Sequence, residues 1–73
     1  MTELDRVVLT VDLPEAGLVA GDVGTVVLVH AAGGAEVEFV TLRGETVGVV
    51  SARPDQVRAV GDREVPHSRA LAA

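Results

Sequence analysis

Valine is the commonest apolar residue of this chain, and Phe39 is its only aromatic side chain. Hydrophobic residues occupy 48% of the 73 positions. The β-branched valine side chain is stiff at χ1 and packs well on a pleated sheet, whereas it fits a helix less well. The composition therefore predicts an all-β fold, and the length allows one domain with a small core.

Five segments have the pattern of short β-strands. The segment 35–41 alternates most regularly, with Val37 and Phe39 on one face and Glu36 and Glu38 on the other. The five predicted strands are residues 6–12, 22–29, 35–41, 46–51 and 57–60.

Glycine and proline mark the expected connections between these strands. A long loop is expected at 13–21, and Pro54 favours a single helical turn at 54–56, just before the last strand. The predicted turn glycines are Gly21, Gly24, Gly33, Gly34 and Gly44. This arrangement predicts an SH3-like small barrel over residues 1–60, with a C-terminal tail over 61–73.

Strand alternation divides the apolar residues between a core and an outer face. The predicted core contains Val7, Leu9, Val11, Val23, Val27, Val29, Val37, Phe39, Val47, Val49, Val57 and Val60. The apolar residues left pointing outward are Val8, Val26, Leu28, Val40 and Val50. A contiguous patch of this kind on neighbouring strands is typical of a protein interface.

Two resemblances support the predicted barrel. The segment Ala20–Val27 resembles the glycine-containing strand of KOW-type small barrels, in which one glycine shapes the turn and another lets the backbone pass close to the facing strand. With 8–15, 37–39 and 54–60, the chain resembles a bacterial family of short domains of unknown function over about residues 4–60. The resemblance implies an SH3-like barrel and no catalytic residues, and Leu28 departs from it because a polar residue is expected there.

Catalytic and metal-binding patterns are absent from the sequence. His30 and His67 lie far apart and would have to converge with Glu36 or Glu38 to hold a metal ion. Ser51 has no histidine–acid pair at a recognisable spacing, and the chain has no cysteine. We therefore expect neither enzymatic activity nor a cofactor or metal ion.

The charge pattern restricts the kinds of partner. All the cationic side chains are arginine, and eleven acidic residues give a net charge of −5, which opposes binding to nucleic acid or anionic lipid. A small basic patch of Arg43, Arg53 and Arg58 would be the basis for nucleic-acid binding of the KOW type. Without tryptophan or tyrosine, the chain cannot line the aromatic groove that binds proline-rich peptides. The acidic N-terminus does not resemble a secretion signal and the longest apolar run is too short to span a membrane, so we expect a cytoplasmic protein.

These observations favour a non-catalytic protein–protein interaction module, either a homo-oligomer or a small subunit of a complex. An antitoxin or immunity-like inhibitor is an alternative, since an acidic barrel would fit a basic surface. A KOW-type nucleic-acid binder is a further alternative, and an accessory role in a nitrile-hydratase-type system rests on analogy of fold alone. The end of the chain, residues 70–73, also resembles a bacterial tag that marks stalled polypeptides for proteolysis.

Overall fold

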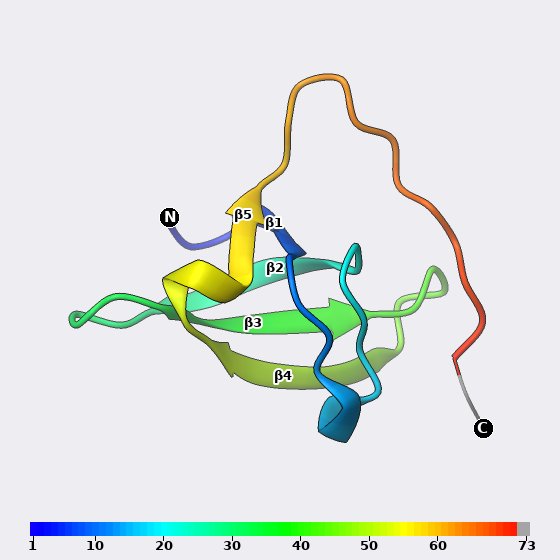
Figure 1. Ribbon diagram of the computed structural model, residues 1–73, viewed down its shortest axis with the longest axis horizontal. Coiled ribbons are helices and arrows are strands. Elements are labelled where there is room, and N and C mark those ends of the chain that lie inside the picture. The colour runs from blue at the N-terminus through cyan, green and yellow to red at the C-terminus, as the bar shows by residue number, and fades with distance from the viewer. Residues whose placement is uncertain (72–73) are drawn as a thin grey trace.

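The computed structural model describes residues 1–71, which form one five-stranded antiparallel sheet that curls into a small barrel-like fold (Figure 1). The strands are β1 (Arg6–Leu9), β2 (Val23–Val29), β3 (Ala35–Val40), β4 (Thr46–Ala52) and β5 (Val57–Ala59). Their order across the sheet is β4-β3-β2-β1-β5, and two 3-10 turns, η1 (Pro14–Ala16) and η2 (Pro54–Gln56), lie between strands. The all-β prediction is confirmed. No helix in the described part of the chain is long and apolar enough to cross a membrane.

Strand β1, the first strand, pairs with β2 on one side and with the last strand, β5, on the other. It is shorter than the predicted segment 6–12. Beyond Leu9, the Thr10 amide donates to the Gln56 carbonyl at 2.9 Å, and the Asp12 carboxylate accepts from the Ala20 amide at 2.9 Å. The chain therefore leaves the sheet early to form the 13–21 loop. The predicted helical turn at 54–56 is confirmed as η2.

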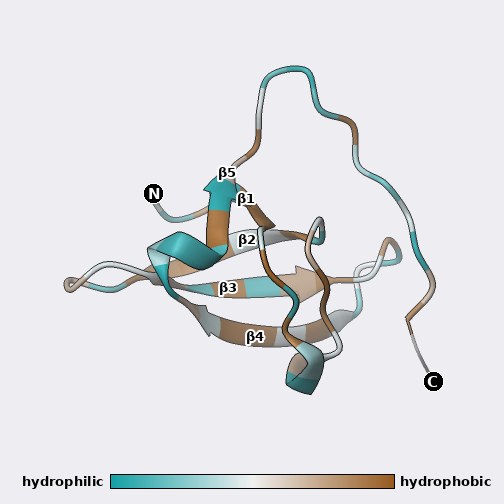
Figure 2. Cartoon of the chain, in the orientation of Figure 1, coloured by the Kyte–Doolittle hydropathy of each residue, from teal (hydrophilic) through white to brown (hydrophobic). Residues whose placement is uncertain are grey.

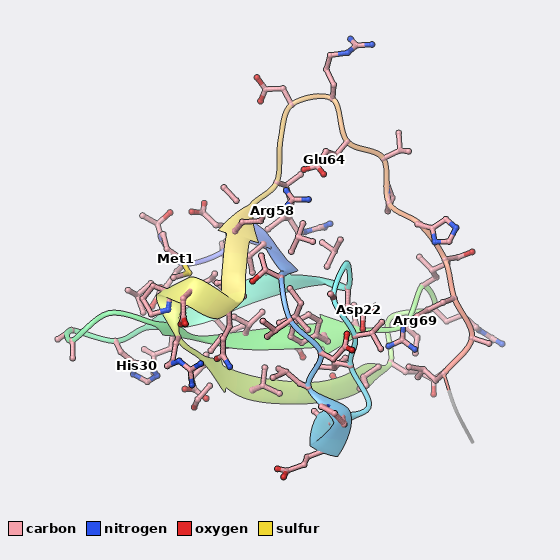
Figure 3. All side chains as sticks on the ribbon, viewed as in Figure 1. Met1, Asp22, His30, Arg58, Glu64 and Arg69 are labelled. Carbon is pink, nitrogen blue, oxygen red and sulfur yellow. The ribbon has the colours of Figure 1, made fainter. Side chains whose placement is uncertain are left out.

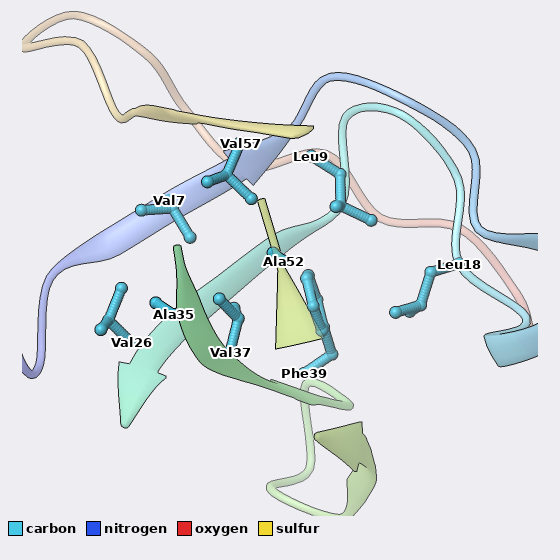
Figure 4. Close-up of a cluster of buried hydrophobic side chains, with 9 residues drawn as sticks. All are labelled: Val7, Leu9, Leu18, Val26, Ala35, Val37, Phe39, Ala52 and Val57. Carbon is cyan, nitrogen blue, oxygen red and sulfur yellow. The ribbon is translucent and has the colours of Figure 1, made fainter. Parts of the chain in front are cut away.

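The core lies between the curled strands and the 13–21 loop (Figure 4). Five of the predicted core residues are buried in it, namely Val7, Leu9, Val37, Phe39 and Val57. Four further residues complete the cluster, namely Leu18, Val26, Ala35 and Ala52. Leu18 comes from the loop, where the strand pattern gave no reason to expect a core residue.

The predicted inward face of β2 is wrong. Val26 is fully buried, whereas Val27 and Val29 are exposed and Val23 is only half-buried. The reason is Gly24, whose backbone lies so close to β3 that an added Cβ would stand 2.5 Å from Cγ1 of Val37. Gly24 and Val26 therefore share the inner face. A register shift in the β2–β3 pairing between Val26 and Leu28 ends the regular alternation beyond them.

The assignments in β4 and β1 also need correction. Val50 packs against the core, since it pairs with the buried Val37, and Val49 points outward instead. A register shift between Phe39 and Val40 lets Val47, at the start of β4, also pack against the core. Val8 is buried too, and its cross-strand partners are Val23 and Arg58. The predicted core residues Val11 and Val60 lie beyond the ends of β1 and β5 and are exposed.

Four of the five predicted turn glycines have a positive φ, namely Gly21, Gly33, Gly34 and Gly44. Position 34 also requires a residue without a side chain, since a Cβ there would lie 2.7 Å from the Ala52 carbonyl oxygen. Gly24 is not in a turn but within β2. Because Gly24 has no side chain, β2 can lie close to β3. This is the second of the two glycine roles that the KOW resemblance implied.

Candidate functional site

The predicted outward patch does not form one surface. Val8 and Val26 are buried and Val50 packs against the core, so only Leu28 and Val40 are strongly exposed. Leu28 lies in β2 near the β2–β3 hairpin, whereas Val40 ends β3 and faces a groove beside the C-terminal tail. The structure therefore replaces the predicted patch with two separate features.

The first feature is a run of three consecutive exposed apolar residues at the end of β2. Val27, Leu28 and Val29 are 40%, 49% and 38% exposed. This "β2 apolar run" lies beside the β2–β3 hairpin, which projects at the left in Figure 2. A regular strand turns every second side chain inward, and here the register shift between Val26 and Leu28 breaks that rule. Three adjacent exposed apolar residues in a strand are unfavourable unless they have a function.

Acidic side chains lie beside Leu28 on the outer face of the sheet, whereas Val29 pairs with the buried Ala35. Leu28 pairs with Glu36 of β3, and Thr25 pairs with Glu38. Glu38 in turn pairs with Val49 of β4, which is exposed. The outer face is thus a mixture of apolar and acidic side chains. It would suit a partner that offers both apolar and basic groups.

Glu36 is the centre of a small polar cluster that the sequence did not reveal. Its Oε2 accepts a hydrogen bond from Ser51 Oγ and lies 2.6 Å from His30 Nε2. The hydrogen bond from Ser51, followed by the contact with His30, holds the pKa of the Glu36 carboxyl below its usual range. The acid stands between the serine and the histidine, so the imidazole is not placed to take the serine proton. The cluster thus links Ser51 and His30 through one carboxylate oxygen of Glu36.

The two histidines of the described residues do not come together. The structure brings His30 to Glu36, but His67 lies in the tail, beside the groove that Val40 also lines. No group of three or more potential ligands among histidine, aspartate and glutamate forms in residues 1–71.

The second feature is the C-terminal tail, which returns to the barrel after β5. It arches outward from β5 and then passes the end of the barrel that carries the β3–β4 turn (Figure 1). Arg69 holds it there. Its Nε donates to Asp22 Oδ1 at 2.9 Å, and its Nη2 donates to Asp22 Oδ2 at 2.6 Å and to the Gly17 carbonyl at 3.0 Å (Figure 3).

The loop that precedes β2 holds the Asp22 carboxylate in position for this contact. Its Oδ2 also accepts from the Val19 amide at 2.9 Å, so the carboxylate position is fixed by the backbone. The hydrogen bonds from Arg69, together with that from Val19, hold the pKa of Asp22 below its usual value. The Asp22 side chain is 17% exposed and that of Arg69 31%, which makes this the least exposed of the ion pairs in residues 1–71.

A groove of about 300 Å³ lies between the tail and the barrel end. We call it the tail groove. Its barrel wall is mainly apolar and includes Leu18, Val23, Phe39, Val40, Leu42 and Val47. Its tail wall includes Pro66, His67, Ser68, Arg69 and Leu71. The segment 70–73, which resembles a proteolysis tag, is only partly described by the structure. Ala70 and Leu71 belong to the described tail, and residues 72 and 73 lie outside the described residues.

The arginines of the predicted basic patch lie apart. Arg43 is in the β3–β4 turn, at the opposite end of the barrel from η2, which Arg53 precedes (Figure 1). Arg53 pairs with Asp55, and Arg58 makes two hydrogen bonds to Glu64, at 2.8 and 2.7 Å. The hydrogen bonds from Arg58 and from the Gly61 amide lower the pKa of Glu64 to about 2. Two of the three cations are therefore already paired within the chain.

Comparison with known proteins gives one family. Residues 3–59 match the family described as a domain of unknown function, DUF4926, so the chain belongs to that family. The match contains all five strands and ends before the tail. No curated protein and no solved structure matches the chain.

Proposed function

We propose that this DUF4926 chain is a non-catalytic protein–protein interaction module that binds its partner through the β2 apolar run. The observation that carries the proposal is the exposure of three consecutive apolar residues, Val27, Leu28 and Val29, beside a strand, β3, that keeps an alternating pattern. Covering these side chains would remove apolar surface from water, which is the dominant favourable term in protein association.

The acidic border indicates the chemistry of the partner. Glu36 and Glu38 lie on the same outer face, and the chain carries a net charge of −5. An apolar surface with basic residues around it would be complementary to this face. An antitoxin or immunity-like inhibitor that covers a basic protein surface is therefore the more specific form of the proposal.

We further propose that the fold is an SH3-like barrel and that the protein is bacterial and cytoplasmic. Support for the barrel type comes from β1 lying between β2 and β5 and from the 3-10 turn η2 directly before β5. A KOW-type nucleic-acid binder is less favoured, because Arg53 and Arg58 are paired with acids and the net charge is negative.

Photo-crosslinking in the cells that naturally produce the protein tests the β2 apolar run. A photoreactive residue at position 27 should give a discrete protein adduct, and the change Leu28→Asp should abolish that adduct. Because Leu28 is half-exposed, the variant should remain folded, and the new carboxylate opposite Glu36 should lower its stability by about 0.2–1 kcal/mol.

Position 65 is a matched control because Val65 is an apolar residue in the tail and is 88% exposed. A photoreactive residue there should not give the same adduct. The proposal is wrong if positions 27 and 65 give the same adducts, or if the adduct at 27 survives Leu28→Asp in a folded chain.

A further inference from the structure

The tail groove has features of a peptide-binding site that is occupied by its own chain. The tail is exposed from Gly61 to Leu71 and contains no helix or strand. Among the described tail residues, only Arg69 makes side-chain hydrogen bonds to the 13–22 region of the barrel. Beyond the Arg58–Glu64 pair, the tail is thus hydrogen-bonded to the barrel through one side chain at the end of an exposed connection.

The contact at Asp22 is specific for arginine. One guanidinium group makes two parallel hydrogen bonds to the carboxylate and a third to the Gly17 carbonyl. A planar fork of donors fits this arrangement, whereas a lysine ammonium cannot reproduce it. Asp22 and Gly17 therefore form a small arginine-recognition site.

The apolar wall of the groove is only partly covered by the tail. Leu71 lines the groove but is still 46% exposed, and about 300 Å³ of space separates the tail from the barrel. Arg69 and Leu71, which are two positions apart, both line the groove. A segment with larger apolar side chains could fill this space better than the tail does.

We propose that the tail groove binds an extended peptide segment of another protein, one that carries an arginine followed two positions later by a large apolar residue. The tail is the intramolecular competitor for this site. Arginine enters the Asp22 site, and the apolar side chain covers the wall formed by Leu18, Phe39 and Val47. The surface is separate from the β2 apolar run, so the two proposals stand or fall independently.

Competition by the tail sets the size of the expected effect. A segment tethered by a short flexible connection has an effective concentration of about 1 mM. For a peptide with a Kd of about 0.1 mM, such a competitor weakens apparent binding about tenfold. Releasing the tail should therefore raise the apparent affinity for an added peptide by about this factor.

Fluorescence anisotropy on the full-length chain tests the proposal. The probe is a labelled peptide with the sequence of residues 66–73, in which Arg69 and Leu71 are present. We expect the double variant Arg69→Ala/Leu71→Ala, which removes both tail contacts, to bind the peptide about tenfold more tightly than the wild type. Arg63→Ala is the matched control, since Arg63 is a tail arginine in none of the ion pairs of residues 1–71. It should bind as the wild type does.

A change in the peptide keeps the test independent of protein folding. A peptide with alanine in place of its arginine should lose binding to the double variant, and one with lysine should bind at least several-fold more weakly. Adding Asp22→Asn to the double variant should also abolish binding. The proposal is overturned if the double variant binds no more tightly than Arg63→Ala, or if the alanine peptide binds as well as the original.

Discussion

Replacing Gly24 by alanine tests whether close packing at this position fixes which side chains of β2 face the core. An added Cβ would lie 2.5 Å from Cγ1 of Val37 and 2.8 and 2.9 Å from two ring carbons of Phe39. Both neighbours are buried members of the core, although Phe39 also lines the tail groove. The strand or the Phe39 ring must therefore shift.

The size of the effect follows from these contacts. Overpacking a close-packed core costs about 1–3 kcal/mol, and three short contacts to two buried side chains place Gly24→Ala near 3 kcal/mol. A core of this size supplies a net stability of only about 3–5 kcal/mol. At about 4–8 °C per kcal/mol, the melting temperature should fall by about 12–24 °C.

Far-UV circular dichroism is the suitable assay, because the chain has no tryptophan or tyrosine for fluorescence. Gly48→Ala is the matched control, since Gly48 also lies in a strand but an added Cβ would meet no atom within 4 Å. That variant should melt close to the wild type or slightly above it, because alanine loses less backbone entropy on folding. If Gly24→Ala melts within a few degrees of Gly48→Ala, close packing does not set the inner face of β2.

Further predictions concern the loop core and the two tail ion pairs. Leu18→Ala should lower the free energy of unfolding by about 2–4 kcal/mol, as measured by urea denaturation, because Leu18 is a buried part of the core cluster. The pKa of Asp22 is lower in the folded state than the usual value of 3.8, so its contribution to stability is complete above 3.8 and is lost as the pH falls through the folded-state pKa. Thermal melts of the wild type should show this acid-dependent loss, and melts of Asp22→Asn should show less of it. An NMR titration of the Glu64 carboxyl should have a midpoint of about 2, and Arg58→Ala should move that midpoint back toward 4.5.

Local sequence patterns were sufficient for much of the architecture. The alternation of valine and glutamate in β3 predicted its buried and exposed faces, and the glycine positions predicted the turns. Pro54 located η2. These features depend on residues close together in sequence, where side-chain period and backbone preference act directly.

The inner faces of β2 and β4 could not be predicted in the same way. In β2, the contact of Gly24 with Val37 and Phe39 decides which residues turn inward, and this contact exists only once β2 and β3 pair. A register shift beyond Val26 then leaves the β2 apolar run exposed. Leu28 was correctly predicted to face outward, whereas Val27 and Val29 were assigned to the core.

The tail groove depends on a contact between residues far apart in sequence. Arg69 and Asp22 are separated by 47 positions, and the KOW resemblance of the segment that contains Asp22 gives no indication of a contact with the tail. The same is true of the cluster around Glu36, in which His30 and Ser51 reach one carboxylate oxygen from different segments. The spacing of residues in the sequence does not show such contacts, because these groups come together only when the chain folds.

The central claim is that Val27, Leu28 and Val29 form a surface that contacts another protein. The most direct measurement compares amide NMR signals of the labelled chain in buffer with those in a lysate of the cells that naturally produce it. The account predicts selective loss of signal at residues 27–29 and at their neighbours Glu36 and Glu38, with the rest of the barrel much less affected. Uniform signal loss, or loss confined to elements away from β2 and β3, would contradict it.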